Sequence, residues 1–210
     1  MSNLTVYGTP ASTYVRTVRL LLAEANIDYD LKEINIFNGE NETDDYLAKH
    51  PFGKIPAMEV DGEKIYETAA ITYYINEKMA GSKYSPSDIL MQARMLQIMA
   101  IVDNYLYPPA VGKIVIQNLI VPSQGGETDK EAVKEAVAPT QKALKAIEDL
   151  YKGSPFLLGS EISLADFHLI PIFVYLSKTP QFDRVTTQTP KLKVWWEQTK
   201  NLASVKKVCA

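Results

Sequence analysis

Residues 50–68 have the composition of a docking site for a small, extended ligand that carries an amide. Pro51 and Gly53 force a loop, and Pro56 opens the next strand, where a missing N–H is tolerated. If the bond between Ile55 and Pro56 is cis, the N–H and C=O of Ile55 face outward and can pair with the ligand as an added strand would. Only about 5–6% of X–Pro bonds in folded proteins are cis, so the trans alternative stays open.

The step from Glu67 to Thr68 begins a predicted helix. Backbone N–H groups at a helix start have no partner within the helix and carry partial positive charge, which favours a ligand carboxylate. The Glu67 carboxylate can accept from a ligand ammonium, and the Thr68 hydroxyl can donate to a carboxylate. This pair suits a ligand end with both an amine and a carboxylate. The alternative that one of these residues only caps the helix stays open.

Short strands and helices in the first 80 residues must position these groups. The dipeptide Asp61-Gly62 between two apolar runs is a strong signal for a hairpin. The last helix of this part is predicted to turn Ala70, Ile71, Tyr74 and Ile75 inward. In chain order, the predicted elements are a strand at Leu4–Tyr7, a helix that begins after Ser12, a strand at 27–36, a turn at 38–41, a short helix at 43–49, strands at Ala57–Val60 and Glu63–Tyr66, and a helix at 67–79.

The composition changes after Gly81. Residues 82–88 are polar and rich in turn formers, which indicates an interdomain linker. From residue 89 the periodicity is only helical, with predicted helices at 89–117, 129–151, 164–178 and 191–201 and a loop at 121–126. We therefore expect a βαβ-plus-hairpin domain at 1–80, a linker at 81–88 and an all-helical domain at 89–210.

Composition excludes several classes of function. A net charge of −3 provides no field for nucleic acid and no basic patch for a membrane surface. Cys209 is the only cysteine, and His50 and His168 are the only histidines, so we expect no disulfide and no metal site. No apolar run approaches the roughly 20 residues of a membrane span. The first residues lack the features of a secretion signal, so we expect a cytoplasmic protein.

The order of these motifs resembles the glutathione transferase family over nearly the whole chain. The resemblance rests on residues 49–56, on 65–71 after the short hairpin, and, for the phi-type enzymes in particular, on 10–13 and 107–110. It implies a thioredoxin-like first domain that holds glutathione, as a co-substrate, against the proline loop. Lys54, the Ile55 backbone and Pro56 would contact the ligand, and Glu67 with Thr68 would hold its γ-glutamyl end. No further cofactor is implied.

A glutathione transferase must stabilise the thiolate form of glutathione, because the thiol is mostly protonated at neutral pH. The resemblance gives this role to Ser12, which precedes the first helix, where a hydroxyl donor and the helix N-terminus can point at one anion. Ser12 could also be only an N-cap. Tyr7 and Thr13 are the competing hydroxyls. Arg16 would support the active-site loop, with a solvated arginine on the helix surface as the alternative.

One part of the sequence departs from the phi pattern. A histidine and a lysine follow the Gly-Glu turn in that pattern and help to hold the glycyl carboxylate, whereas this chain has Asn41 and Glu42. Glu42 would repel the carboxylate if it faced the site, while Lys54 keeps a matching contact. We expect binding with an altered affinity, and include Asn41 among the binding residues.

The resemblance also implies an apolar pocket for electrophiles and a homodimer. The pocket residues would be Tyr14 and Phe37 from the first domain and Tyr107, Val111 and Val115 from the second, although helical spacing predicts plain core for most apolar residues near Tyr107. Phe52 protrudes from the proline loop and would insert into the partner subunit, or else is buried in its own.

A second serine is predicted to be structural. Ser163 and Asp166 have the spacing of a capping box, with aspartate in place of the preferred glutamate or glutamine. We expect this pair to start the helix at 164–178 and to take no part in catalysis.

Three functional hypotheses follow from the sequence. The first is an enzyme that conjugates glutathione to small apolar electrophiles, with Ser12 stabilising the thiolate. The second is a protein of the same fold that binds glutathione or apolar ligands without turnover, which the Asn41 and Glu42 departure favours. The third is a structural domain of the translation elongation type, which the lack of an appended domain disfavours.

Overall fold

The first strand, β1 (Leu4–Tyr7), is buried along its whole length, as its apolar sequence predicts. In this computed structural model, which describes residues 4–210, β1 pairs in parallel with β2 (Asp30–Lys32) and antiparallel with β3 (Ala57–Val60). β3 continues through a hairpin into β4 (Glu63–Tyr66), so the sheet order is β2-β1-β3-β4. Asp61 and Gly62 have φ values of 50° and 87° in the turn, so the predicted hairpin is confirmed with its bounds.

The predicted strand at 27–36 is mostly wrong, because only Asp30–Lys32 pairs with a neighbour. β1 is four residues long, and its ladder with β2 ends at the pair Tyr7 and Lys32. Beyond Lys32 the apolar alternation continues without a strand to pair with. The chain then passes through a 3₁₀ turn, η1 (Glu40–Glu42), into the short helix α2 (Asp44–Leu47).

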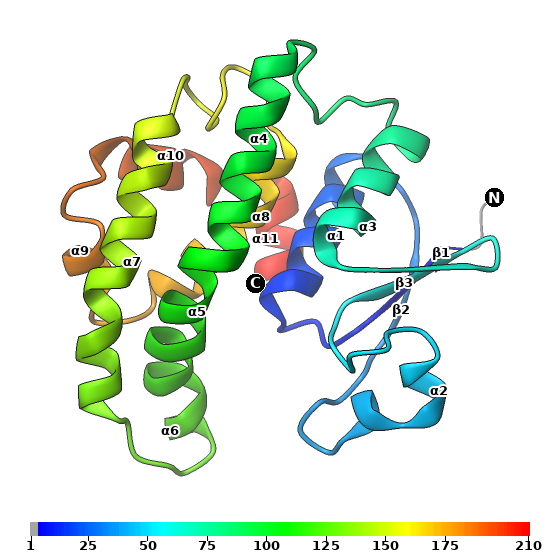
Figure 1. Ribbon diagram of the computed structural model, residues 1–210, viewed down its shortest axis with the longest axis horizontal. Helices are drawn as coiled ribbons and strands as arrows, with labels where there is room; N and C mark the ends of the chain where they lie inside the picture. The colour runs from blue at the N-terminus through cyan, green and yellow to red at the C-terminus, as the bar shows by residue number, and fades with distance from the viewer. Residues whose placement is uncertain (1–3) are drawn as a thin grey trace. The chain divides into compact units, whose positions relative to one another are not determined.

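Two helices accompany the sheet. α1 (Thr13–Glu24) packs beside α3 (Thr68–Tyr74), which continues as a π-helical turn, η2 (Ile75–Met79) (Figure 1). The inward face of this second helix differs from the prediction, because Ala70 is exposed and Thr72 and Asn76 are fully buried. Polar residues fit there because the Thr72 hydroxyl donates to the Thr68 carbonyl at 2.9 Å and the Asn76 Oδ1 accepts from the Tyr84 N–H at 2.9 Å.

The chain divides into two compact units, and the division differs from the expected one at both ends of the helical part. The first unit runs to Tyr84 and includes Ala203–Ala210, and the second is Ser85–Leu202. The last helix, α11 (Ala203–Cys209), packs on α1 and buries Val205 and Val208 (Figure 1). It was expected in the helical domain, but this apolar contact makes it part of the first unit.

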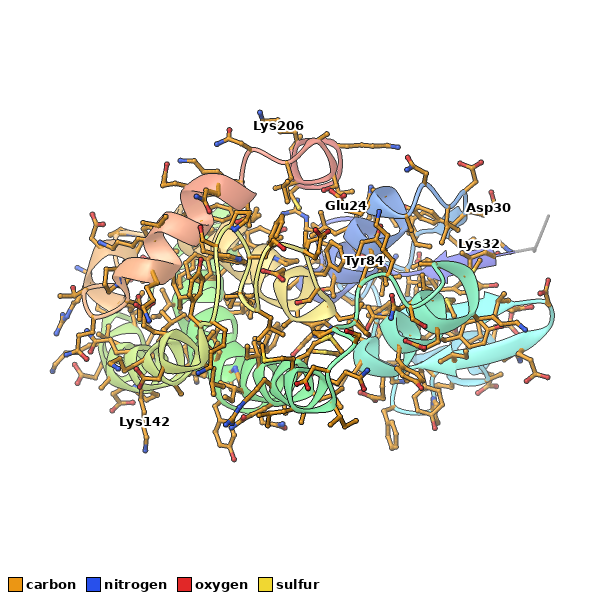
Figure 2. The ribbon with its side chains drawn as sticks, turned by 90° about the horizontal axis from the view of Figure 1, so that it is seen from above. Glu24, Asp30, Lys32, Tyr84, Lys142 and Lys206 are labelled. Carbon is orange, nitrogen blue, oxygen red and sulfur yellow. The ribbon has the colours of Figure 1, made fainter. Side chains whose placement is uncertain are left out.

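Residues 82–84 are also part of the first unit instead of a free linker. Tyr84 is only 1% exposed, and the Ser82 N–H donates to the Asn76 carbonyl at 2.9 Å. Tyr84 and Glu24, the last residue of α1, are labelled in Figure 2. Burial, and after it the charge of Glu24, raise the pKa of Tyr84. The Glu24 carboxylate also accepts from the Ser204 hydroxyl of α11.

The second unit is helical, as predicted, although its first helix extends further than expected. Instead of ending at 117, the run that begins at residue 89 continues to Ser123, because π-helical segments change its register without breaking it. Among the described residues no helix is long and apolar enough to cross a membrane. The elements are α4 (Ile89–Ile101), η3 (Val102–Leu106), α5 (Tyr107–Pro109), η4 (Ala110–Ile120), α6 (Val121–Ser123), α7 (Lys130–Leu150), α8 (Leu164–Leu176), α9 (Phe182–Val185) and α10 (Pro190–Thr199).

The predicted capping box at the start of α8 is confirmed. The Asp166 carboxylate is fully buried and accepts from the Ser163 N–H at 2.9 Å and from the Ser163 hydroxyl at 2.7 Å. It also accepts from the Leu157 N–H at 2.9 Å and from the Trp195 indole N–H at 2.8 Å. Burial raises the pKa of Asp166, and these four donors oppose the rise. Asp166 therefore ties the start of α8 to the preceding loop and to α10.

Candidate functional site

The proline loop presents one residue whose backbone has no partner. The bond between Ile55 and Pro56 is cis, so the first of the two alternatives is the one found. Within the described part of the chain, neither the N–H nor the C=O of Ile55 makes a hydrogen bond. Both groups are therefore available to an amide-bearing ligand, as the sequence predicts.

Three hydrogen bonds fix the loop, one from η1, one within the loop and one from α2. The Asn41 side chain donates from Nδ2 to the Gly53 carbonyl at 2.9 Å, and the Gly53 N–H donates to the His50 carbonyl at 2.9 Å. The buried Tyr46 hydroxyl donates to the Lys54 carbonyl at 2.6 Å. Gly53 has φ 58°, and a Cβ added to it would lie 2.9 Å from the Asn41 carbonyl oxygen. The loop is thus held immediately before Ile55.

Gly8 brings this loop next to the turn that carries Ser12. Gly8 follows β1 with φ 146°, and a Cβ added there would lie 2.5 Å from Val15 Cγ2 and 3.2 Å from the Ile55 Cβ. Only a residue without a side chain allows this approach. The start of α1 and the free backbone of Ile55 therefore lie close together within the first unit.

Ser12 is the N-cap of α1, and its hydroxyl remains available to donate. Its Oγ accepts from the Val15 N–H at 3.5 Å, which is a long bond for a cap. No hydrogen bond in which the Ser12 hydroxyl is the donor occurs among the described residues. Ser12 is half-buried at the helix N-terminus, where partial positive charge favours an anion. The cap and a thiolate-binding role are therefore compatible.

Arginine side chains hold the turn before Ser12. Arg16 Nε donates to the Pro10 carbonyl at 3.2 Å, and Arg19 Nη1 donates to the same oxygen at 3.4 Å. Arg16 is only 7% exposed, so the alternative of a solvated arginine is wrong. Its position fits the predicted support of the loop.

The competing hydroxyls are less well placed than Ser12. The Tyr7 hydroxyl donates to Glu59 Oε2 at 3.1 Å, which uses its only hydrogen. Burial, and then the hydrogen bond and charge of Glu59, raise the pKa of Tyr7. Thr13, the first residue of α1, is 5% exposed. A donor engaged with a carboxylate and a buried hydroxyl are both poorer partners for a ligand thiolate.

Glu67 and Thr68 lie where the hairpin ends and α3 begins. The ladder between β3 and β4 ends at the pair Ala57 and Tyr66, so Glu67 is the next residue on its strand. Glu67 has φ 69°, a strained conformation for a residue with a side chain. Its carboxylate makes no capping bond to α3, so the alternative of a Glu67 cap is wrong. The Thr68 hydroxyl makes no hydrogen bond among the described residues.

The Asn41 side chain is already engaged in the loop, unlike the Glu67 carboxylate, which makes no capping bond. The Nδ2 of Asn41 is used by Gly53, and its Oδ1 is buried without a partner in the described chain. One hydrogen of the amide group thus holds the loop, and because the amide nitrogen carries two hydrogens, the predicted contact of Asn41 with a glycyl end stays a prediction. Glu42 and Lys54 are both exposed.

The five residues predicted to contact an electrophile belong to different units. In the first unit, Tyr14 is half-buried and Phe37 is 71% exposed. In the second, Tyr107 is half-buried and burial raises its pKa, while Val111 and Val115 are 5% and 2% exposed. Side chains as buried as these two valines have little surface left to offer, so Tyr14, Phe37 and Tyr107 carry most of this prediction.

Sequence reasoning gave no role to Tyr46 and did not foresee the contacts of two glycines. Tyr46 holds the loop backbone, Gly53 lies against the Asn41 carbonyl, and Gly8 lets the loop approach α1. His50 lies beneath Phe52 and Tyr66, with its ring centre 4.9 Å from that of Tyr66. Phe52 is 69% exposed, so burial within its own subunit is excluded and protrusion is confirmed. Glycines within a loop motif were the signal that could have found two of these contacts.

Known proteins resemble the whole chain. A family model described as glutathione S-transferase, N-terminal domain, matches residues 2–77, and one described as glutathione S-transferase, C-terminal domain, matches residues 98–202. Glutathione S-transferase F7 of Arabidopsis thaliana is 32% identical, over 99% of this chain and 100% of the relative.

Solved structures agree. The structure of glutathione transferase F7 from Populus trichocarpa has a TM-score of 0.85 at 33% identity, covering 98% of this chain and 97% of its own. Glutathione S-transferase I from maize, in complex with an atrazine glutathione conjugate, has a TM-score of 0.84 at 28% identity, covering 99% of this chain and 96% of its own.

Proposed function

The chain belongs to the glutathione S-transferase family, and on that premise we propose that it conjugates glutathione to small apolar electrophiles, with Ser12 stabilising the thiolate. The resemblance to the family and to its phi-type members is confirmed, as is the fold class of a thioredoxin-like first unit with a helical second unit. The electrophile and the residues that act on either substrate remain part of the proposal.

One observation carries the proposal: the Ser12 hydroxyl has a hydrogen to donate, at a helix N-terminus next to the free Ile55 backbone. A γ-Glu-Cys-Gly ligand would pair the amide groups of its cysteine with Ile55, which brings the sulfur toward the start of α1. The γ-glutamyl ammonium and carboxylate would meet Glu67 and Thr68. Lys54, which immediately precedes Ile55, would be the cation that meets the glycyl carboxylate.

The conjugation reaction requires that the thiolate of glutathione be stabilised. A cysteine thiol has a pKa near about 8.5, so at pH 7 only a few per cent is thiolate. The donated hydrogen bond and the partial positive charge of the helix start stabilise the thiolate over the thiol, and the released proton leaves to water. With a chloronitrobenzene substrate, the thiolate sulfur bonds to the ring carbon, and chloride leaves with the electron pair of the broken C–Cl bond.

The maize relative supports the same product class. Its structure contains a glutathione conjugate of atrazine, so a protein with this fold at 28% identity holds a thioether of glutathione. For the present chain, the electrophile-contacting residues are those predicted from the sequence, chiefly Tyr14, Phe37 and Tyr107. A cytoplasmic location is part of the same proposal.

The test combines retention and turnover. Wild-type protein should be retained on immobilised glutathione and should turn over a chloronitrobenzene. Ser12→Ala should be retained but should lose turnover, whereas Tyr7→Phe should keep most of it. Full turnover in Ser12→Ala with loss in Tyr7→Phe would make Tyr7 the thiolate partner. Retention without turnover across several electrophile classes would favour a binding protein.

We also propose a homodimer in which Phe52 contacts the partner subunit. The Phe52 side chain is 69% exposed on a loop whose backbone is held by hydrogen bonds, and its ring is edge-on to the exposed Tyr66 ring, so the two aromatics form an apolar surface that a partner subunit could cover. Two-fold dimers are the commonest homo-oligomers. Sedimentation should give the mass of a dimer for the wild type and a weaker dimer for Phe52→Ala, while a wild-type monomer at micromolar concentration would refute this part.

A further inference from the structure

His50 is a buried titratable residue that the proposed mechanism does not use. It is 2% exposed, and its Nδ1 atom makes no hydrogen bond within the described part of the chain. Buried polar nitrogens normally have a partner, so this one requires an explanation. Its ring centre lies 4.9 Å from the ring centre of Tyr66 and 6.2 Å from that of Phe52.

The backbone holds this ring at the junction between the loop and the hairpin. The His50 N–H donates to the Tyr46 carbonyl at 3.0 Å, and the His50 carbonyl accepts from the Gly53 N–H at 2.9 Å. Tyr66, which the ring contacts, directly precedes Glu67. The imidazole therefore contacts the residue that immediately precedes Glu67, the residue proposed to hold the γ-glutamyl ammonium.

Two charged side chains among the described residues act on the ring. They are Glu67, at the end of the hairpin, and Lys54, in the same loop. Lys49 is adjacent to His50 in the chain, but its ammonium donates to the Asp45 carbonyl at 2.8 Å and lies 5.3 Å from the Tyr7 ring centre. A proton on His50 would thus be felt mainly by the two proposed ligand contacts, Glu67 and Lys54.

We propose that His50 is a positioning residue for the glutathione site, whose neutral form leaves the Glu67 carboxylate available to the γ-glutamyl ammonium. This inference rests on the proposed function. When the imidazole takes up a proton, its positive charge lies beside Glu67 and competes with the ligand ammonium for the same carboxylate. The affinity for glutathione therefore falls as His50 becomes protonated.

The electrostatic surroundings agree with this linkage. Burial lowers the pKa of His50, the Glu67 carboxylate and then an interaction with the His50 backbone oppose that effect, and Lys54 adds to it. The net effect lowers the pKa of His50 below its ordinary value, which favours the neutral imidazole. A bound ammonium offsets the Glu67 charge that favours the protonated imidazole. Ligand binding should therefore lower the His50 pKa further, and protonation should weaken binding to the same extent.

The experiment measures ligand affinity as a function of pH. S-methylglutathione is the probe, because its blocked sulfur removes thiolate formation and the Ser12 role from the measurement. Titration calorimetry between pH 7.5 and 5.5 should show the wild-type affinity falling by about three- to tenfold. His50→Gln, which is uncharged at every pH, should bind with an affinity that stays flat. His168→Gln, which changes the other histidine, is the matched control and should keep the wild-type slope.

A second measurement needs no variant. NMR titration of the His50 imidazole in the wild type should give a lower pKa with saturating S-methylglutathione than without it. An unchanged His50 pKa, a flat wild-type affinity or a persistent slope in His50→Gln would each overturn the inference while S-methylglutathione still binds. If the wild type neither binds the probe at any pH nor turns over substrate, the proposed function itself fails, and the inference falls with it.

Discussion

Two helices of this chain begin at a serine, and their hydrogen bonds differ. At α8, Ser163 is 3% exposed, and its hydroxyl and N–H both donate to the buried Asp166 carboxylate, at 2.7 Å and 2.9 Å. At α1, Ser12 is half-buried, and its hydroxyl only accepts, at 3.5 Å from the Val15 N–H. Each helix belongs to its own unit, so the two starts can be compared without reference to how the units are arranged.

The difference distinguishes a structural serine from one that is available for chemistry. The Ser163 hydrogen is committed to a carboxylate that also receives the Leu157 and Trp195 N–H groups. The hydroxyl hydrogen of Ser12 is not donated to any described residue. The turn before Ser12 is held instead by Arg16 and Arg19, which donate to the Pro10 carbonyl. Substitutions at the two starts should therefore separate loss of stability from loss of turnover.

The largest effect is expected for Asp166→Ala. The substitution leaves the N–H groups of Leu157, Ser163 and Trp195 without an acceptor in the interior, at about 1–3 kcal/mol each. We expect unfolding in urea to show a stability loss of about 3–5 kcal/mol. Turnover per folded molecule at low temperature should change little. A loss below about 1 kcal/mol would show that the hydrogen bonds at the start of α8 do not stabilise the fold as proposed.

Ser12→Ala should give the opposite pattern. Removing one preorganised donor to a reacting anion typically costs about 100-fold or more in turnover, close to about 2.7 kcal/mol. The cap that is lost has a long bond, so the free energy of unfolding should fall by only about 0.5 kcal/mol, at the low end for caps. Paired urea unfolding and turnover measurements check both values. Ser12→Thr, which keeps the hydroxyl, is the matched control and should recover part of the turnover.

Ser163→Ala removes a single hydroxyl, as Ser12→Ala does, and so compares the two serines directly. It removes a charge-assisted bond of 2.7 Å but leaves the Ser163 N–H on Asp166. We expect a stability loss of about 1.5–3 kcal/mol and unchanged turnover. If stability were as insensitive here as at Ser12, bond length and burial would not distinguish the two serines.

Tyr46→Phe should have the smallest effect of these four. It deletes the 2.6 Å bond to the Lys54 carbonyl but keeps the buried ring. Because this bond fixes the residue before Ile55, we expect KM for glutathione to rise by about fivefold, equivalent to about 1 kcal/mol, with kcat little changed. A fall in kcat with constant KM would place the effect on the Ser12 side of the site instead.

The sequence predicted those elements whose local chemistry determines them. The hairpin was predicted with its bounds because Asp61 and Gly62 adopt the positive φ values that its turn requires. The strand at 27–36 was overextended because alternation does not reveal that β1 offers only four residues to pair with. α11 was missed because a seven-residue helix forms by packing on α1, which periodicity cannot foresee.

The candidate site was predictable where motifs carry the chemistry and not where contacts between distant segments do. Ser12, Ile55, Glu67 and Thr68 could be chosen from the sequence. Among the described residues no partner takes the Ser12 hydroxyl hydrogen, the Ile55 backbone groups, the Glu67 carboxylate or the Thr68 hydroxyl, and their roles toward glutathione stay predictions. The hydrogen bond between Asn41 and Gly53 could not, because it joins a turn to a loop twelve residues away. That contact adds loop support to Asn41, whose role as a ligand contact stays a prediction.

The central claim is that Ser12 stabilises the glutathione thiolate, and the pKa of the bound thiol tests it most directly. Ultraviolet absorption of the thiolate, titrated with pH in the binary complex, gives that pKa without an electrophile. For the wild type and Tyr7→Phe we expect it to lie well below about 8.5, and for Ser12→Ala we expect it near that unperturbed value. A low thiol pKa that persists in Ser12→Ala, or that is lost in Tyr7→Phe, would contradict the claim.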